Sequence, residues 1–102
     1  MITALVRFPL PAGTTRDAAQ ALYEASAPVY RAAPGLVRKY YLFDETPSGG
    51  GVYLWRDRAS AEAFYTPEWR AGLKARLGAG PEVTLFETPV IVDNLVGETV
   101  TA

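Results

Sequence analysis

Apolar and polar residues alternate with a period of two at the start of the chain, which predicts a β-strand over residues 2–8. Over residues 15–33 the apolar positions recur instead at the spacing of a helix. Thr14 or Thr15 can cap the start of this helix, and Pro34-Gly35 is a stop signal. Pro28 lies inside the segment, and we expect a bend there because proline has no amide hydrogen to donate.

Two further strands are predicted over residues 36–44 and 51–56, each with apolar or aromatic residues on both faces. A strand that is apolar on both sides is usually covered on both sides. The residues between them, Thr46-Pro47-Ser48-Gly49-Gly50, have the composition of a turn. The pattern therefore predicts a hairpin at the centre of a sheet.

A second helix is predicted after Asp57, with a break at Thr66-Pro67-Glu68, where a new helix start is encoded. A last strand is expected over residues 83–93, with Pro89 at a bulge or on a sheet edge. Residues 94–102 are expected to form an arm.

The predicted order is β-α-β-β-α-β in a single domain spanning residues 1–102. This order is typical of the ferredoxin-like α+β fold, an antiparallel sheet with two helices on one face. The other face would then be left with large apolar side chains, and a second copy of the sheet is the simplest cover. We assign to that face Val37, Tyr41, Phe43, Tyr53 and Trp55, and we expect a homodimer.

Composition and charge exclude several classes of function. The net charge is -1, so long-range attraction to nucleic acid or to a membrane surface is not expected. The chain has no cysteine and no histidine, which argues against thiolate or imidazole metal sites, haem ligation and a thiol nucleophile. We expect no metal and no cofactor. No apolar run reaches the ~20 residues that span a bilayer, and a cytoplasmic location is expected.

Several short runs resemble a known family: Pro34-Gly35-Leu36, Lys39, residues 50–55, residues 61–64 and the end of the chain over residues 86–94. Together they resemble the small monooxygenases of the dimeric α+β barrel superfamily, above all its YdhR-like group. The resemblance implies two ferredoxin-like sheets that pack into an α+β barrel. It also implies a monooxygenase that works without a cofactor.

Two other branches of that superfamily frame the chemistry. The quinone-forming monooxygenases have an Asn on the third strand and a Trp at the start of the second helix, where this chain has Leu54 and Arg58. Haem-degrading members use a histidine ligand, which this chain lacks. The sequence thus departs from both patterns and assigns no catalytic residue.

Aromatic residues are numerous for this length, and they are explained either by core and interface packing or by a pocket that stacks a planar ligand. We expect such a pocket beneath the break in the second helix, unless Trp69 fills the gap itself. Lys39, flanked by tyrosines, needs a carboxylate such as Glu87 or an anionic ligand if it is buried. The expected substrate-binding residues are Tyr23, Tyr40, Phe64, Tyr65, Trp69 and Arg70.

Three functions remain open from the sequence. The first is a cofactor-independent monooxygenase or related enzyme acting on a planar, hydrophobic, phenolic molecule. The second is a non-catalytic dimer that binds a similar small molecule. The third is a dimer with no ligand, whose aromatic residues are all structural.

Overall fold

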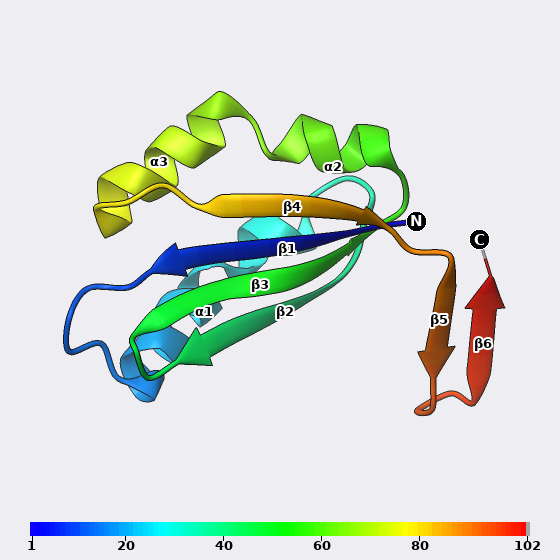
Figure 1. The fold of residues 1–102 in the computed structure, drawn as a ribbon, viewed down its shortest axis with the longest axis horizontal. Helices are drawn as coiled ribbons and strands as arrows, with labels where there is room; N and C mark the ends of the chain where they lie inside the picture. Colours follow the sequence, from blue (N-terminus) through cyan, green and yellow to red (C-terminus); the bar gives the residue numbers. More distant parts are fainter. Residues whose placement is uncertain (102) are drawn as a thin grey trace.

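A computed structural model describes residues 1–101 and contains a four-stranded sheet, three helices and a separate C-terminal hairpin (Figure 1). No helix in this part of the chain is both long and apolar enough to cross a membrane. The elements in chain order are β1 (Ile2–Pro9), α1 (Arg16–Arg31), β2 (Leu36–Asp44), β3 (Ser48–Trp55), α2 (Arg58–Phe64), α3 (Pro67–Leu77), β4 (Glu82–Glu87), β5 (Val90–Asp93) and β6 (Glu98–Thr101).

The main sheet has the strand order β2-β3-β1-β4, and each neighbouring pair is antiparallel. Together with the element order, this arrangement confirms the expected ferredoxin-like fold. The order also corrects one expectation, because β1 and β3 are the central strands and β2 is an edge strand. The central place of β1 agrees with its burial, since four of its residues form part of the core: Ile2, Ala4, Val6 and Phe8.

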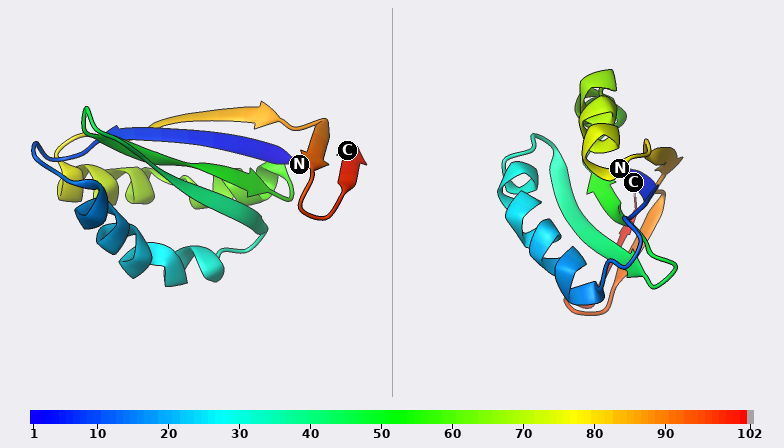
Figure 2. Two further views of the ribbon diagram at one scale, coloured as in Figure 1. Left: turned by 90° about the horizontal axis from the view of Figure 1, so that it is seen from below. Right: turned by 90° about the vertical axis from the view of Figure 1, so that its left-hand side faces the viewer.

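All three helices lie on the same side of the sheet (Figure 2). Each begins at a residue whose side-chain oxygen accepts a hydrogen bond from a backbone amide three residues on: Thr15 for α1, Asp57 for α2 and Thr66 for α3. α1 continues through Pro28 to Arg31. The predicted break of the second helix is confirmed, since Thr66 ends one helix and caps the next.

The predicted assignment of the two sheet faces was wrong. Tyr53 and Trp55 are buried beneath the helices, opposite Ala4 and Ile2 of β1. Tyr41 and Phe43 of β2 lie on this helix face too, because Tyr41 pairs with Gly51 and Phe43 with Gly49, on the face that Tyr53 shares. The pattern of β2 and β3 could not separate two apolar faces, and only their register against β1 decides which face the helices cover.

The opposite face of the sheet, which we call the open face, carries no helix. It includes Leu5, Tyr40, Leu42, Val52, Leu54 and Phe86. Tyr40 and Phe86 are 55% and 51% exposed, respectively. The open face is therefore apolar in its own right, although its members differ from those expected.

The end of the chain differs from the single strand and arm that the sequence predicts. β4 ends at Glu87, and Pro89 separates it from β5, which pairs with β6. Gly97 has a positive φ of 68° in the connecting turn, a conformation that favours glycine. The resulting C-terminal hairpin extends beyond the end of the main sheet (Figure 1).

Gly49 and Gly50 do not lie in the turn, although the sequence pattern placed them there. Gly49, Gly50 and Gly51 lie inside β3 and pair with β1 on one side and β2 on the other. The turn is made by the three residues before Ser48. Gly49 and Gly51 matter for the site, because they leave space on the helix face of the sheet.

Candidate functional site

A pocket of about 280 Å³ lies between α1, α3 and the helix face of the sheet. Its mouth is edged by Leu22 and Val29 of α1, which are exposed, and by Arg76 of α3. Its inner wall is mostly aromatic and includes Phe8, Tyr23, Tyr30, Tyr41, Tyr53 and Trp69. A concave, mainly apolar cavity with few polar groups is the usual form of a small-molecule site.

Lys39 supplies the amine of this pocket. Its Nζ lies 3.2 Å from the ring centroid of Tyr30, 3.6 Å from that of Tyr41 and 4.5 Å from that of Tyr53. We call these three rings and the amine the lysine cage. The rings come from α1, β2 and β3, so the cage exists only when helix and sheet are packed together.

Gly51 makes room for the lysine cage. A Cβ atom at this position would lie 3.2 Å from Cε of Lys39 and 2.9 Å from Cε1 of Tyr53. A Cβ at Gly49 would collide with the hydroxyl of Tyr23. Because Gly49 and Gly51 have no side chain, the side chains of Tyr23, Lys39 and Tyr53 occupy the space beside them.

Burial lowers the pKa of Lys39 to about 6. Among residues 1–101 the amine has no ion pair, and the expected partner Glu87 lies on β4, at the opposite edge of the sheet. The faces of the three rings attract a cation and so oppose the effect of burial on this pKa. The lysine cage therefore holds an amine that can exist in both protonation states near neutral pH.

Three of the tyrosine hydroxyls around the pocket are held neutral. Burial raises the pKa of Tyr23, Tyr41 and Tyr53. Tyr23 donates to the carbonyl oxygen of Leu42 over 2.8 Å, and the Tyr41 hydroxyl lies 2.7 Å from Oγ of Ser26. These contacts fix both rings, which stack on each other with centroids 4.6 Å apart.

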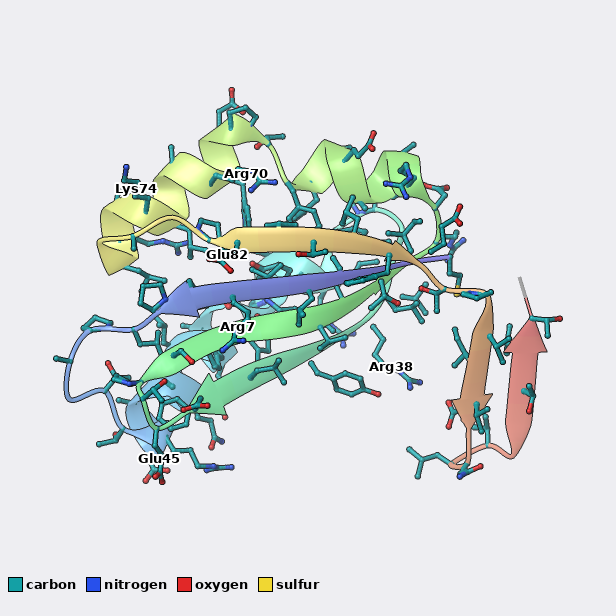
Figure 3. All side chains as sticks on the ribbon, viewed as in Figure 1. Arg7, Arg38, Glu45, Arg70, Lys74 and Glu82 are labelled. Atoms are coloured by element: carbon teal, nitrogen blue, oxygen red, sulfur yellow. The ribbon has the colours of Figure 1, made fainter. Side chains whose placement is uncertain are left out.

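The pocket contains two of the six residues predicted to bind substrate, Tyr23 and Trp69. Phe64 and Tyr65 pack behind Trp69, with ring centroids 5.7 and 5.1 Å from it. Tyr40 lies on the open face, away from the helices. Arg70 lies on the exposed outside of α3 (Figure 3).

The helix break does not leave a gap beneath it. Tyr65 is buried there, and its hydroxyl accepts a hydrogen bond from Nε1 of Trp55 over 3.0 Å. Burial raises the pKa of Tyr65 as well. Trp69 covers this cluster, and its other side faces the pocket.

Three of the four tyrosines in the pocket were not predicted to bind substrate: Tyr30, Tyr41 and Tyr53. A signal for Tyr30 was present, since it lies seven residues after Tyr23 and so on the same helix face. The sequence indicates that Lys39 needs a partner if it is buried, but it does not predict that Lys39 lies in the pocket. No residue pattern indicates that β2 and α1 bring these rings around its amine.

A second, wider groove of about 440 Å³ lies on the other side of the Tyr23 and Tyr41 rings. It runs along α1 and includes Arg16, Glu24 and Phe43. It is more open to solvent and holds no amine among aromatic rings. We therefore place the candidate site in the pocket with the lysine cage. No group of acidic residues within residues 1–101 is arranged to hold a metal ion.

No protein-family model matches this sequence, and no curated protein has a matching sequence. Several solved structures are similar, among them the following two. The NE2512 protein of unknown function from Nitrosomonas europaea is 18% identical, with a TM-score of 0.67 over 85% of this chain and 87% of that chain. A mutant of SnoaB, a cofactor-independent oxygenase from Streptomyces nogalater, is 21% identical, with a TM-score of 0.60 over 85% of this chain and 91% of that chain.

These similarities establish the fold. The chain has a ferredoxin-like α+β fold. At such identities the comparison shows architecture and not activity. Arg58 and Leu54, which stand where the quinone-forming enzymes have Trp and Asn, lie outside the pocket: Arg58 faces solvent at the start of α2 beside Glu62, and Leu54 lies on the open face.

Proposed function

We propose that the protein is a small cofactor-independent monooxygenase or a related enzyme that acts on a planar, hydrophobic, phenolic molecule. The resemblance of its sequence to the YdhR-like group and the fold that it shares with SnoaB support this proposal. The observation that carries it is the pocket itself, in which three tyrosine rings surround one amine and Tyr23 and Trp69 line the same cavity.

The shape and chemistry of the pocket fit such a substrate. Ring faces favour offset or edge contacts with a planar aromatic ligand. A volume of about 280 Å³ is at the small end of ligand pockets, which favours a compact molecule of a few rings. The single amine offers one strong contact for an oxygen, and an ionised phenol is the electron-rich form that can react with dioxygen.

Oxygen consumption tests this proposal. The protein is mixed with a panel of anthrones and hydroquinones, and dissolved oxygen and products are measured. For an anthrone, the methylene and O₂ give the quinone carbonyl and water, so one O₂ should disappear per quinone formed. Tight binding of these compounds without oxygen uptake would favour the non-catalytic binding module instead.

We further propose that two copies of the protein pack their open faces together. The row Leu5, Val52 and Tyr40 crosses β1, β3 and β2 and is apolar throughout. Exposed apolar patches of this kind commonly mark interfaces. The second copy would cover Tyr40, which the helices do not reach.

The C-terminal hairpin gives separate support for a partner. An isolated two-stranded hairpin is at best marginally stable in water. Val90 and Val92 of β5 are 55% and 66% exposed, and the hairpin is tied to the main sheet by the Arg38–Asp93 ion pair at 3.6 Å. Arg38 lies near the start of β2 and points toward β5 (Figure 3). In a dimer, these valines can pack on the second copy.

A further inference from the structure

Lys39 is half-buried and lacks the partners that normally accompany a lysine withdrawn from water. Among residues 1–101 its amine makes neither an ion pair nor a side-chain hydrogen bond, and withdrawing an ammonium from water without either is costly. A methionine at this position would fill the same space without that cost. The amine is therefore unexplained by the packing of the protein alone.

The groups around Lys39 include no acid that could neutralise it. Tyr23 and Tyr30 face it from α1, Tyr41 from its own strand and Tyr53 from β3. The charged groups nearby are the guanidiniums of Arg76, at the mouth of the pocket, and of Arg31 and Arg38, in an adjoining groove. No Asp or Glu lines either cavity. The surroundings thus favour a neutral amine in the empty pocket and an anion as its ligand.

The lysine cage also suits the protonated amine. An ammonium over the faces of Tyr30, Tyr41 and Tyr53 gains cation–π attraction. A phenolate beside it would supply the missing charge-assisted hydrogen bond. Both the proton-free and the proton-bound state of Lys39 therefore have a source of stabilisation in the same place.

We infer that Lys39 is the proton acceptor of the pocket and takes the hydroxyl proton of a bound phenol or enol. In this step the O–H bond of the ligand breaks and an N–H bond of Lys39 forms, with no change in oxidation state. The products are a phenolate and an ammonium ion, held as a pair inside the ring of tyrosines. The inference rests on the proposed phenolic substrate and names the residue that activates it.

The experiment uses 2-naphthol as the probe and naphthalene, which lacks the hydroxyl, as the matched ligand. Binding is measured without oxygen at about pH 8, below the ordinary phenol pKa of about 10, so that the free probe is neutral. Ultraviolet absorbance reports whether the bound probe is ionised. Calorimetry in two buffers of different ionisation enthalpy reports whether a proton leaves the complex.

We expect the native protein to bind the naphtholate ion with almost no proton released, because the proton moves to Lys39. Lys39→Arg should also bind naphtholate but release about one proton, since a guanidinium is already charged. Lys39→Met should bind the neutral probe about ten- to a hundredfold more weakly, the effect of one charge-assisted hydrogen bond. Naphthalene should bind all three proteins alike.

Lys74 provides the control, since it is the only other lysine and lies on the exposed side of α3 (Figure 3). Lys74→Met should match the native protein. Release of one proton by the native protein would overturn the inference, because Lys39 would then be charged beforehand. A bound probe that stays un-ionised, or a probe that does not bind, would overturn it too.

The result is independent of oxygen chemistry. If the protein ionises the probe but consumes no oxygen with any phenol, the proposed oxygenase activity is wrong. The role of Lys39 as a proton acceptor still stands in that case. If Lys39→Met consumes oxygen as fast as the native protein, the proposed oxygenase activity stands, but Lys39 is not its proton acceptor. If Lys39→Met does not fold, as judged by circular dichroism, Lys39→Arg alone decides through its proton release.

Discussion

At the scale of single residues, the protein places an amine where burial and cation–π attraction act in opposite directions. Lys39 is held among Tyr30, Tyr41 and Tyr53, and burial lowers its pKa to about 6. A lysine in the unfolded chain titrates near 10.4. The difference means that this one residue makes the stability of the protein depend on pH.

The free energy of unfolding of the native protein should rise relative to that of Lys39→Met as pH increases. Between about pH 6 and pH 10 the unfolded chain binds the extra proton, so raising the pH favours the folded state. Near pH 6 we expect Lys39→Met to be more stable by roughly 3 kcal/mol, about half of the full effect of the pKa shift because the amine retains some contact with water. Urea unfolding across this range measures the difference.

All the tyrosines are present in both proteins, which differ only at position 39. Lys74→Met should show no such pH dependence relative to the native protein. A gap between the native protein and Lys39→Met that stays constant from pH 6 to pH 10 would show that the pKa of Lys39 is not lowered.

Gly51 is a second residue at which a substitution should have a specific effect, because its Cα lies against the lysine cage. Gly51→Ala should destabilise the protein by about 1–3 kcal/mol, because its Cβ would press on Tyr53, Lys39 and the carbonyl oxygen of Tyr40. Gly72→Ala is the control, since α3 has open space there and alanine favours the helix by about 1 kcal/mol. Thermal unfolding should move in opposite directions for the two variants, and equal shifts would contradict this account of the pocket.

At the scale of elements, the break between α2 and α3 places the side chain of Trp69 in the wall of the pocket. Thr66 caps α3 and Pro67 is its first residue, which places Trp69 in the first turn. From there Trp69 contacts Phe64 and Tyr65 on one side and the pocket on the other. The same tryptophan therefore serves packing and the candidate site.

Trp69→Ala should lower the free energy of unfolding by about 3 kcal/mol, since Trp69 is only partly buried. It should also weaken the binding of 2-naphthol, because one wall of the pocket is lost. Thr66→Ala, which removes the cap alone, should cost about 1 kcal/mol and leave binding unchanged at a temperature where both variants are folded. Urea unfolding and calorimetric titration separate the two effects, and unchanged binding in Trp69→Ala would assign this residue to packing alone.

At the scale of the whole molecule, the two faces of the sheet differ in what covers them. The helices cover one face and enclose the pocket, whereas the open face and the C-terminal hairpin leave apolar side chains exposed (Figures 1 and 2). A stable interface buries about 800 Å² on each partner, an area that a four-stranded sheet face can supply.

The native protein should sediment with a mass near twice 11.1 kDa. Val52→Glu should shift it toward the monomer, since it places a charge between Leu5 and Tyr40 in the middle of the open face. Ala63→Glu, an exposed position on α2, serves as the control for added charge and should leave the mass unchanged. A native protein that remains a monomer at micromolar concentration would contradict the dimer.

The sequence by itself determined the order of the elements as far as β4, and several of their ends. The alternation of β1, the caps at Thr15, Asp57 and Thr66, and the stop at Pro34-Gly35 depend on local sterics and hydrogen bonds, which neighbouring residues specify. These local signals were sufficient for the ferredoxin-like fold. They also located Trp69 at a helix start and Tyr23 on an amphipathic helix.

Only the tertiary structure decided which side of β2 and β3 meets the helices. Both faces of these strands are apolar, so their sequence pattern is the same for either orientation, and the pairing of β3 with β1 selects one. That choice moves Tyr40 to the open face and brings Lys39 and Tyr41 beneath α1. The lysine cage depends on the same choice, because its rings come from three elements that are distant in sequence and meet only when the helix packs on the sheet.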